Sequence, residues 1–378
     1  MNHFPFVTRD PVSPDIRLTQ EVIGCAIYKL NGKIASIFVP SGKGVSPEIR
    51  RSSFLISLSG WKRICPVMHF SLNRRDFLKL SGTAGLVLSP LGVIAGEAFS
   101  RKGPARLQPS LAAYSFRDFF KDANHERTTN ANPARRIDLF EFVDYCAEQR
   151  CGGAELTSYY FPKDTDDAFL LKLRRHCFLK GIEVSGGAVG NTFTHPPGEK
   201  RDEQMRYVKQ WVDHYAVLGA PHIRVFAGNA PSGVSKEKAK QLCIEALEEC
   251  ADYAGKRGIF LGIENHGGIV AEPDGLLDII RTVKSPWIGI NLDSGNFHTD
   301  DPYQDFERCT PYAVNVQLKA EIQRRGQKKE QADLGKFVKL LRAATYQGYV
   351  ALEYESEESP WTAVPPLLKQ MQDLFNEA

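Results

Sequence analysis

Four oxygen-bearing side chains stand at matching places in the last four of a series of short apolar runs. Glu264 follows the run 259–263, Asp293 ends the run 287–293, Gln317 lies in Val-Gln-Leu-Lys, and Glu353 lies in Ala-Leu-Glu-Tyr-Glu. Runs of this length and composition indicate buried parallel strands, and each polar residue then sits where its strand opens into a loop. A carboxylate at such a place is either a ligand or an acid/base.

Three of these side chains carry negative charge, and parallel strands would direct them to one rim. Their convergence is unfavourable unless a cation or protons compensate. A divalent metal is the simplest compensation, with Glu264, Asp293, Glu353 and the amide oxygen of Gln317 as ligands. This all-oxygen set suits Mn²⁺ or Mg²⁺ better than zinc. In the alternative, the acids pair with Arg224 and Lys319 in a solvated rim.

Further polar residues near the strand ends are candidate contacts for a substrate. They are Glu155, His222, Arg224, His266, Asn296, His298 and Lys319. Arg224 and Lys319 could hold hydroxyls, a carboxylate or a phosphate, or could serve only as counter-ions. Glu155 suits a contact with substrate or with Arg224, whereas the two loop histidines could also have no function.

Eight strand patterns alternate with helical patterns from residue 99 to residue 378. We expect strands at 110–116, 153–157, 182–186, 222–227, 259–264, 287–293, 313–319 and 349–353. Apolar residues recur at helical spacing between them, and several of these segments end in glycine, as at Gly181 and Gly258. Eight such units predict an α/β fold, a (β/α)8 TIM barrel. The alternative is an open doubly wound sheet, but no Gly-x-Gly-x-x-Gly follows the first strand.

Composition places the chain among ordinary globular proteins. It has 378 residues, 42% of them apolar and 25% charged, with a net charge of +3. No basic stretch is interleaved with aromatic residues, which argues against a nucleic-acid partner. The eight cysteines show no Cys-x-x-Cys spacing and are expected to be reduced core residues.

The N-terminal region differs from the rest. Residues 1–67 have no sustained periodicity and are expected to be disordered or not translated, with Met68 as the true start. Residues 68–98 then carry Arg74-Arg75, a weakly apolar segment and small residues at the end, the order of a twin-arginine export signal. We therefore expect a periplasmic protein. Glycines and a proline interrupt the apolar segment, which argues against a stable membrane anchor.

Residues 99–378 resemble the xylose isomerase-like TIM barrels, which comprise sugar phosphate isomerases/epimerases and relatives of endonuclease four. The resemblance rests on Ile-Glu-Asn-His-Gly-Gly at 263–268, Asn-Leu-Asp-Ser-Gly-Asn at 291–296, Val-Gln-Leu-Lys at 316–319 and Ala-Leu-Glu-Tyr-Glu at 351–355. It implies a divalent cation at Glu264, Asp293, Gln317 and Glu353. Gln317 departs from the family pattern, which has histidine there, and Asn296 stands where epimerase-like members often have histidine.

The resemblance also implies a reaction. In the related epimerases the glutamates of strands five and eight act on opposite sides of the substrate, one removing a proton next to a carbonyl and the other returning it, which assigns these roles to Glu264 and Glu353. We predict a metal-dependent isomerase or epimerase of a sugar or polyol. A keto-sugar dehydratase or lyase and a non-catalytic sugar-binding barrel are the alternatives. A phosphodiesterase on abasic DNA would need a histidine-rich cluster that the sequence lacks. An oligomer is compatible with the sequence.

Overall fold

The computed structural model describes residues 25–30, 33–38, 56–58, 96–122 and 135–377. The chain divides into two compact units, residues 1–92 and 93–378. The predicted export signal at 68–98 lies outside the described residues, apart from its last three positions.

The first unit contains a small antiparallel sheet. Strand β1 (Cys25–Leu30) pairs with β2 (Lys33–Phe38), which pairs with β3 (Ile56–Leu58). No strand was expected in this stretch, although the sequence has Asn31-Gly32 between the two longer strands, and Asn-Gly is the dipeptide most typical of two-residue hairpins.

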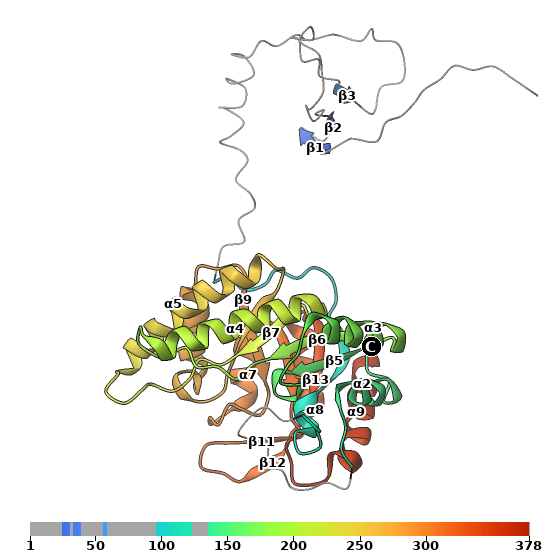
Figure 1. Ribbon diagram of the computed structural model, residues 1–378, viewed down its shortest axis with the longest axis vertical. Helices are drawn as coiled ribbons and strands as arrows, with labels where there is room; N and C mark the ends of the chain where they lie inside the picture. The colour runs from blue at the N-terminus through green and yellow to red at the C-terminus, as the bar shows by residue number, and fades with distance from the viewer. Residues whose placement is uncertain (1–24, 31–32, 39–55, 59–95, 123–134, 378) are drawn as a thin grey trace, which may run out of the picture. The chain divides into compact units, whose positions relative to one another are not determined.

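The second unit is a closed barrel of eight parallel strands, which confirms the predicted fold (Figure 1). The strands follow one another around the barrel in chain order: β4 (Arg106–Ala112), β5 (Gly153–Thr157), β6 (Glu183–Ala188), β7 (His222–Val225), β8 (Phe260–Glu264), β9 (Ile288–Asp293), β10 (Ala313–Leu318) and β13 (Gln347–Leu352). Parallel pairing between β13 and β4 closes the ring.

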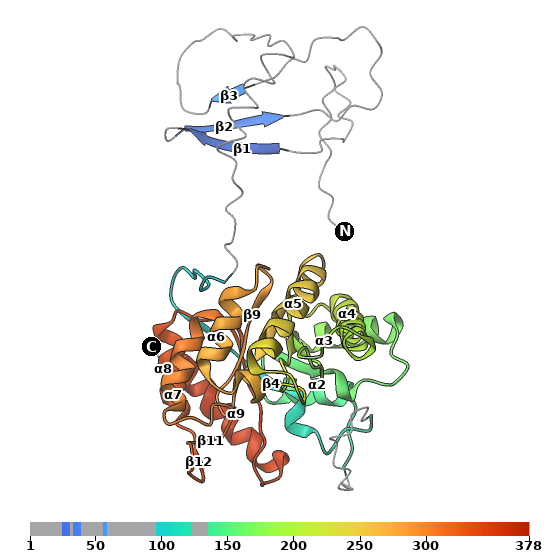
Figure 2. The same ribbon diagram turned by 90° about the vertical axis from the view of Figure 1, so that its left-hand side faces the viewer.

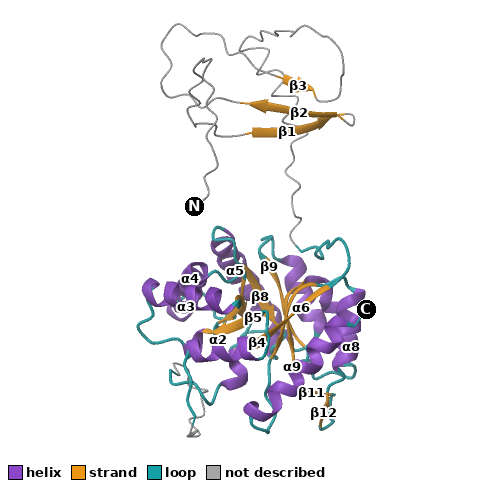
Figure 3. Ribbon diagram, turned by 90° about the vertical axis from the view of Figure 1, so that its right-hand side faces the viewer, coloured by secondary structure: helices purple, strands orange, loops and turns teal. Residues whose placement is uncertain are grey.

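Eight α-helices of the described barrel surround these strands (Figure 3). They are α2 (Leu139–Glu148), α3 (Asp167–Lys180), α4 (Glu199–Leu218), α5 (Lys236–Gly255), α6 (Pro273–Thr282), α7 (Pro302–Cys309), α8 (Leu334–Ala343) and α9 (Pro360–Asn376). Neighbouring helices such as α3, α4 and α5 pack side by side on the outside (Figure 2).

Local sequence explains several helix ends. The Asp138 side chain accepts from the backbone N–H of Glu141, and the Glu141 side chain accepts from that of Asp138, which forms a capping box at the start of α2. At the C-terminal end of α3, Gly181 has a φ of 68°, the left-handed conformation that favours glycine. Sequence signals therefore mark the start of α2 and the end of α3.

Strand positions agree with the predicted ones for β5 and nearly so for most others. The first strand is the exception, because it runs from Arg106 to Ala112 and not over 110–116. Residues Ala113–Phe116 form a 3₁₀ turn instead. Leu111 and Ala112 in the strand and Ala113 in the 3₁₀ turn are all fully buried, so apolar character alone does not mark where the strand ends.

The six cysteines of the described barrel are free and buried, which confirms their prediction as reduced core residues: Cys146, Cys151, Cys177, Cys243, Cys250 and Cys309. No helix among the described residues is long and apolar enough to cross a membrane.

Beyond β10, the chain forms a two-stranded antiparallel hairpin, β11 (Glu321–Gln323) with β12 (Lys329–Gln331). The hairpin follows the carboxyl end of a barrel strand, so it belongs to the end at which TIM barrels place their functional loops. We call this end of the barrel the mouth.

Candidate functional site

The predicted strand-end carboxyl groups all lie at the mouth. Glu264 ends β8, Asp293 ends β9, and Glu353 directly follows β13, and each is at least 95% buried. Gln317 of β10 is also fully buried and lies opposite Asp293 in the register between β9 and β10. Because these groups are shielded from solvent, the protein groups that contact them determine whether each one is stable in its charged form.

Lys319 pairs with two of these carboxylates, Asp293 and Glu353, and with a third acid, Glu355. Its ammonium Nζ lies 3.2 Å from Asp293 Oδ2 and 3.1 Å from Glu353 Oε2, and it also donates to Glu355. The lysine side chain is only 11% exposed. Burial by itself would lower the pKa of Lys319, but Asp293, Glu353 and Glu355 together raise it well above its ordinary value. Lys319 is therefore positively charged, and its ammonium lies among three acidic side chains.

Glu264 belongs to a second cluster. Its Oε2 lies 2.9 Å from Nε of the buried Arg224, and its Oε1 accepts from Asn296 at 2.7 Å and lies 3.1 Å from Nδ1 of His266. Burial alone would raise the pKa of Glu264, but Arg224 and, to a lesser degree, His266 and Lys319 outweigh it and lower the pKa to about 2. Glu264 is thus held ionised.

A ring of amides lies beneath these clusters. Asn315 donates to Glu155 Oε2 at 2.6 Å and to Asn291 Oδ1 at 2.8 Å, and Asn291 donates to Gln317 Oε1 at 2.6 Å. Gln317 closes the ring by donating to Glu155 Oε1 at 2.6 Å, and it also donates to Glu353 Oε1 at 3.2 Å. Every member has a partner, which makes the ring a fixed polar layer across the barrel.

Two acids of this layer hold protons more tightly than usual. Burial, and then the charge of Glu353, raise the pKa of Glu155 to about 8. Burial also raises the pKa of Glu353, although Lys319 opposes the shift. The two strand-end glutamates predicted to act in proton transfer therefore have pKa values moved in opposite directions, down for Glu264 and up for Glu353.

The loops after β8 and β9 hold the acids in place through backbone contacts. The Asn265 side chain accepts from the N–H of Asp293 at 2.9 Å and donates to its carbonyl, so it extends the sheet beyond the strands. Asp293 Oδ1 in turn accepts from the N–H of Gly295 at 2.7 Å. A Cβ at Gly295 would meet Lys319 Cδ at 2.8 Å, so the glycine allows the lysine stem to pass.

These contacts do not fit a metal shell. Among the described residues, Glu264, Asp293 and Glu353 form no group of three arranged to hold one ion. Glu264 faces Arg224, Lys319 stands between Asp293 and Glu353, and the predicted ligand atom of Gln317, its amide oxygen, accepts from Asn291. What faces the carboxylates is the amide N–H of Gln317, which cannot ligate a cation.

A cavity of about 190 Å³ adjoins Lys319 at the mouth. Asn296, His298 and Glu355 line it together with residues of the hairpin β11–β12. His266 and His298 are exposed, and His266 also packs against Phe226 with 4.6 Å between ring centroids. The cavity is mainly polar, which suits a small hydroxylated molecule.

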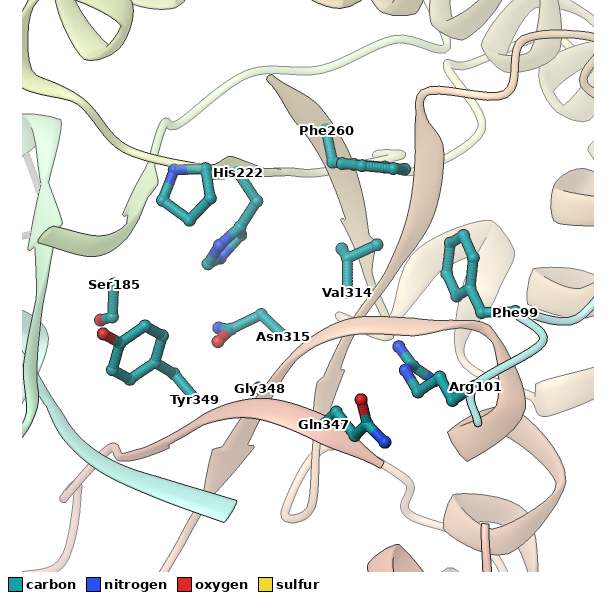
Figure 4. A pocket seen from close by; sticks show the side chains of 11 residues that line it. Phe99, Arg101, Ser185, His222, Phe260, Val314, Asn315, Gln347, Gly348 and Tyr349 are labelled. Atoms are coloured by element: carbon teal, nitrogen blue, oxygen red, sulfur yellow. The ribbon is translucent and has the colours of Figure 1, made fainter. Parts of the chain in front are cut away.

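His222 does not join the other predicted contacts. It is the first residue of β7 and lines a larger cavity, of about 410 Å³, formed by the amino-terminal ends of the strands (Figure 4). Arg101 and Tyr349 line the same cavity. His222 and Arg224 share one short strand, but Arg224 contacts Glu264 whereas His222 lines this second cavity.

Sequence reasoning missed Asn291 and Asn315 as members of the site. A signal for both was present, because Asn315, Gln317 and Lys319 alternate along β10, and Asn291 and Asp293 alternate along β9. Side chains two residues apart in a strand share one face. Polar residues at this spacing between buried apolar ones indicate a polar barrel interior.

Comparison with known proteins places the chain in a family. The family model described as "Xylose isomerase-like TIM barrel" matches residues 140–376. The chain belongs to this family. No curated protein matches it by sequence.

Several solved structures resemble this one in fold. The IOLI protein with a bound zinc atom is 16% identical, with a TM-score of 0.56 over 71% of this chain and 96% of the other. D-psicose 3-epimerase, solved in the presence of D-fructose, is 15% identical, with a TM-score of 0.55 over 69% and 89%. The 3-keto-D-glucoside 4-epimerase YcjR of E. coli is 15% identical, with a TM-score of 0.53 over 71% and 99%. Several structural neighbours are thus sugar epimerases, and one of the neighbours binds a metal.

Proposed function

We propose that this chain is an isomerase or epimerase that moves a proton next to the carbonyl of a sugar or sugar derivative. The observation that carries the proposal is the pair of buried glutamates at the mouth, Glu264 and Glu353, held in opposite electrostatic surroundings. Groups whose surroundings move their pKa values apart are the usual basis of acid and base assignments. The sugar epimerases among the structural neighbours support the substrate class.

In this proposal Glu353 holds or releases the transferred proton, because burial raises its pKa toward the working range of an acid/base group. Glu264 stays ionised beside Arg224 and accepts a proton only when a substrate displaces one of its present donors. Lys319 and Asn296 lie at the cavity, where their N–H groups would hold substrate oxygens. No step passes through a metal, because the contacts of Glu264, Lys319 and Gln317 do not fit a shell for the Mn²⁺ or Mg²⁺ that the sequence predicts.

The test is hydrogen exchange in deuterated water. The full chain is incubated with a panel of keto-sugars, including D-psicose, D-fructose and 3-keto-glucosides, and deuterium at the carbon beside the carbonyl is measured by NMR. Glu264→Gln and Glu353→Gln should each abolish conversion of one epimer into the other, and deuterium incorporation should be lost in the variant that lacks the glutamate on the side of the substrate's proton. Glu272→Gln serves as the matched control, because Glu272 is half exposed and pairs with Arg325 on the surface. Loss of water from the sugar would indicate the dehydratase alternative.

One observation favours a second candidate, a non-catalytic sugar-binding barrel. Both oxygens of Glu264 already have partners in Arg224, Asn296 and His266. A sugar that binds, as seen by calorimetry, without any deuterium incorporation would support this candidate and reject proton transfer.

We also propose that the protein is exported by the twin-arginine route and that translation starts at Met68. The support is the order of residues 73–98 in the sequence. Mass spectrometry of the protein from native cells tests it, because a peptide from residues 1–60 would contradict the start site.

A further inference from the structure

Lys319 occupies the centre of the acidic cluster at the mouth. Its ammonium donates to Glu355 and lies within ion-pair distance of the carboxyl groups of Asp293 and Glu353. The ammonium therefore balances the negative charge of these acids at the place where a divalent ion would otherwise do so.

The surroundings fix the lysine in this position. Its backbone N–H donates to the hydroxyl of Ser294 at 2.9 Å, and Gly295 leaves room for its stem. With its side chain 11% exposed, the ammonium has little water around it to replace the carboxylates. If the lysine left the cluster, the buried acids Asp293 and Glu353 and the partly buried Glu355 would each lose the cation that they contact.

The amide of Gln317 is fixed as well. Its Nε2 faces Glu155 and Glu353, which accept, while its Oε1 faces the amide N–H of Asn291. Asn291 cannot turn to compensate, because its own oxygen accepts from Asn315, which is oriented by Glu155. Presenting the Gln317 oxygen to the mouth would therefore disrupt the whole amide ring.

From these contacts we propose that Lys319 takes the place of the divalent cation, so that this barrel works with a resident ammonium and without a metal. The inference concerns the same site as the proposed function but does not depend on its reaction, since metal binding is measured without substrate. It makes Lys319 the group that faces developing negative charge on a substrate oxygen at the adjoining cavity.

The test is a Mn²⁺ titration of the full chain after dialysis against EDTA, followed by calorimetry and electron paramagnetic resonance. We expect the wild type to bind Mn²⁺ no more tightly than ~1 mM, the weak end of protein sites for hard cations. Lys319→Met removes the ammonium and keeps the stem, so Asp293, Glu353 and Glu355 gain an open place for a cation, and affinity for Mn²⁺ should rise at least ~100-fold.

Two controls accompany it. Lys329→Met makes the same change at an exposed lysine that lines the same cavity, and it should not alter Mn²⁺ affinity. Lys319→Arg keeps the charge and should bind Mn²⁺ no better than the wild type. If Lys319→Met folds only when Mn²⁺ is present, as circular dichroism would show, the proposal is supported in the same way.

Stoichiometric, micromolar Mn²⁺ binding by the wild type would overturn the proposal, and so would a folded Lys319→Met variant with unchanged affinity. These outcomes are separable from the fate of the proposed function. Deuterium exchange that requires added Mn²⁺ would reject the role of Lys319 as resident cation and support the proposed isomerase. Weak Mn²⁺ binding without any deuterium exchange would support the role of Lys319 and reject the proposed isomerase.

Discussion

Replacing Arg224 by methionine is the perturbation that most directly probes the electrostatics of the mouth. Arg224→Met removes the guanidinium that lies 2.9 Å from Glu264 and leaves a hydrophobic side chain of similar length beside Phe226. Glu264 would then be a buried carboxylate with only Asn296 and His266 beside it. Losing one partner of a buried ion pair is much more costly than losing a surface pair.

The magnitude follows from the lowered pKa. Glu264 shifts from an ordinary value of 4.5 to about 2 in the folded protein. A shift of this size corresponds to ~3 kcal/mol, in line with the 3–5 kcal/mol typical when one member of a buried pair is removed. Because the folded-state pKa is the lower one, this stability is fully present above pH 4.5 and is lost as the pH falls toward 2.

The assay is urea denaturation of the wild type, Arg224→Met, Glu264→Gln and the double variant. At pH 7 Arg224→Met should lower the free energy of unfolding by ~3 kcal/mol, and the double variant should recover part of that loss. The gap between wild type and Arg224→Met should narrow as the pH falls from 4.5. Arg308→Met is the control, because the Arg308–Asp274 pair is largely exposed and should contribute at most ~1 kcal/mol. A loss below that level in Arg224→Met, or a gap that does not change with pH, would refute the reasoning.

Two other changes test parts of the barrel away from this pair. Burial lowers the pKa of His222 to about 4 in the folded protein, from 6.5 in the unfolded chain. Between pH 6.5 and pH 4 the unfolded chain therefore binds the proton more readily than the folded protein, and the free energy of unfolding falls by up to ~3 kcal/mol as the pH drops through this range. In His222→Gln the melting temperature should fall less over that range than in the wild type, and parallel curves would contradict this. Gln317→Leu leaves Glu155 and Asn291 each short of a partner and should destabilise the protein by ~1–3 kcal/mol. Gln323→Leu, at a residue whose amide donates only to the carbonyl of Gln327 on the surface, should change stability by less than ~0.5 kcal/mol, and equal losses in the two variants would argue against the amide ring.

Much of the barrel follows from the sequence because each unit encodes its own elements. Apolar runs of four to seven residues, separated by helical patterns and glycine stops, overlap all eight strands and lie close to seven of them. The first strand was misplaced because buried residues continue past its end into a 3₁₀ turn. The pairing of β1 with β2 was missed because the sequence signal for it is the short Asn31-Gly32 dipeptide and not a long apolar period.

The sequence indicates which strand-end residues lie near one another at the mouth, but not which contacts they make. Strand ends alone placed Glu264, Asp293, Gln317 and Glu353 at one mouth, because parallel strands end at the same edge. Whether Lys319 would point into the cluster or toward solvent depends on the room left by Gly295, a contact between loops that no local pattern encodes. The direction of the Gln317 amide depends on Glu155, which is 162 residues away in the chain.

The most direct test of the site is an anomalous-difference map of crystals soaked in Mn²⁺, collected near the manganese absorption edge. The contacts predict no manganese between Asp293 and Glu353, with the ammonium of Lys319 in that place and the oxygen of Gln317 turned toward Asn291. A manganese peak bound by Glu264, Asp293, Glu353 and the oxygen of Gln317, with Lys319 displaced, would contradict the account.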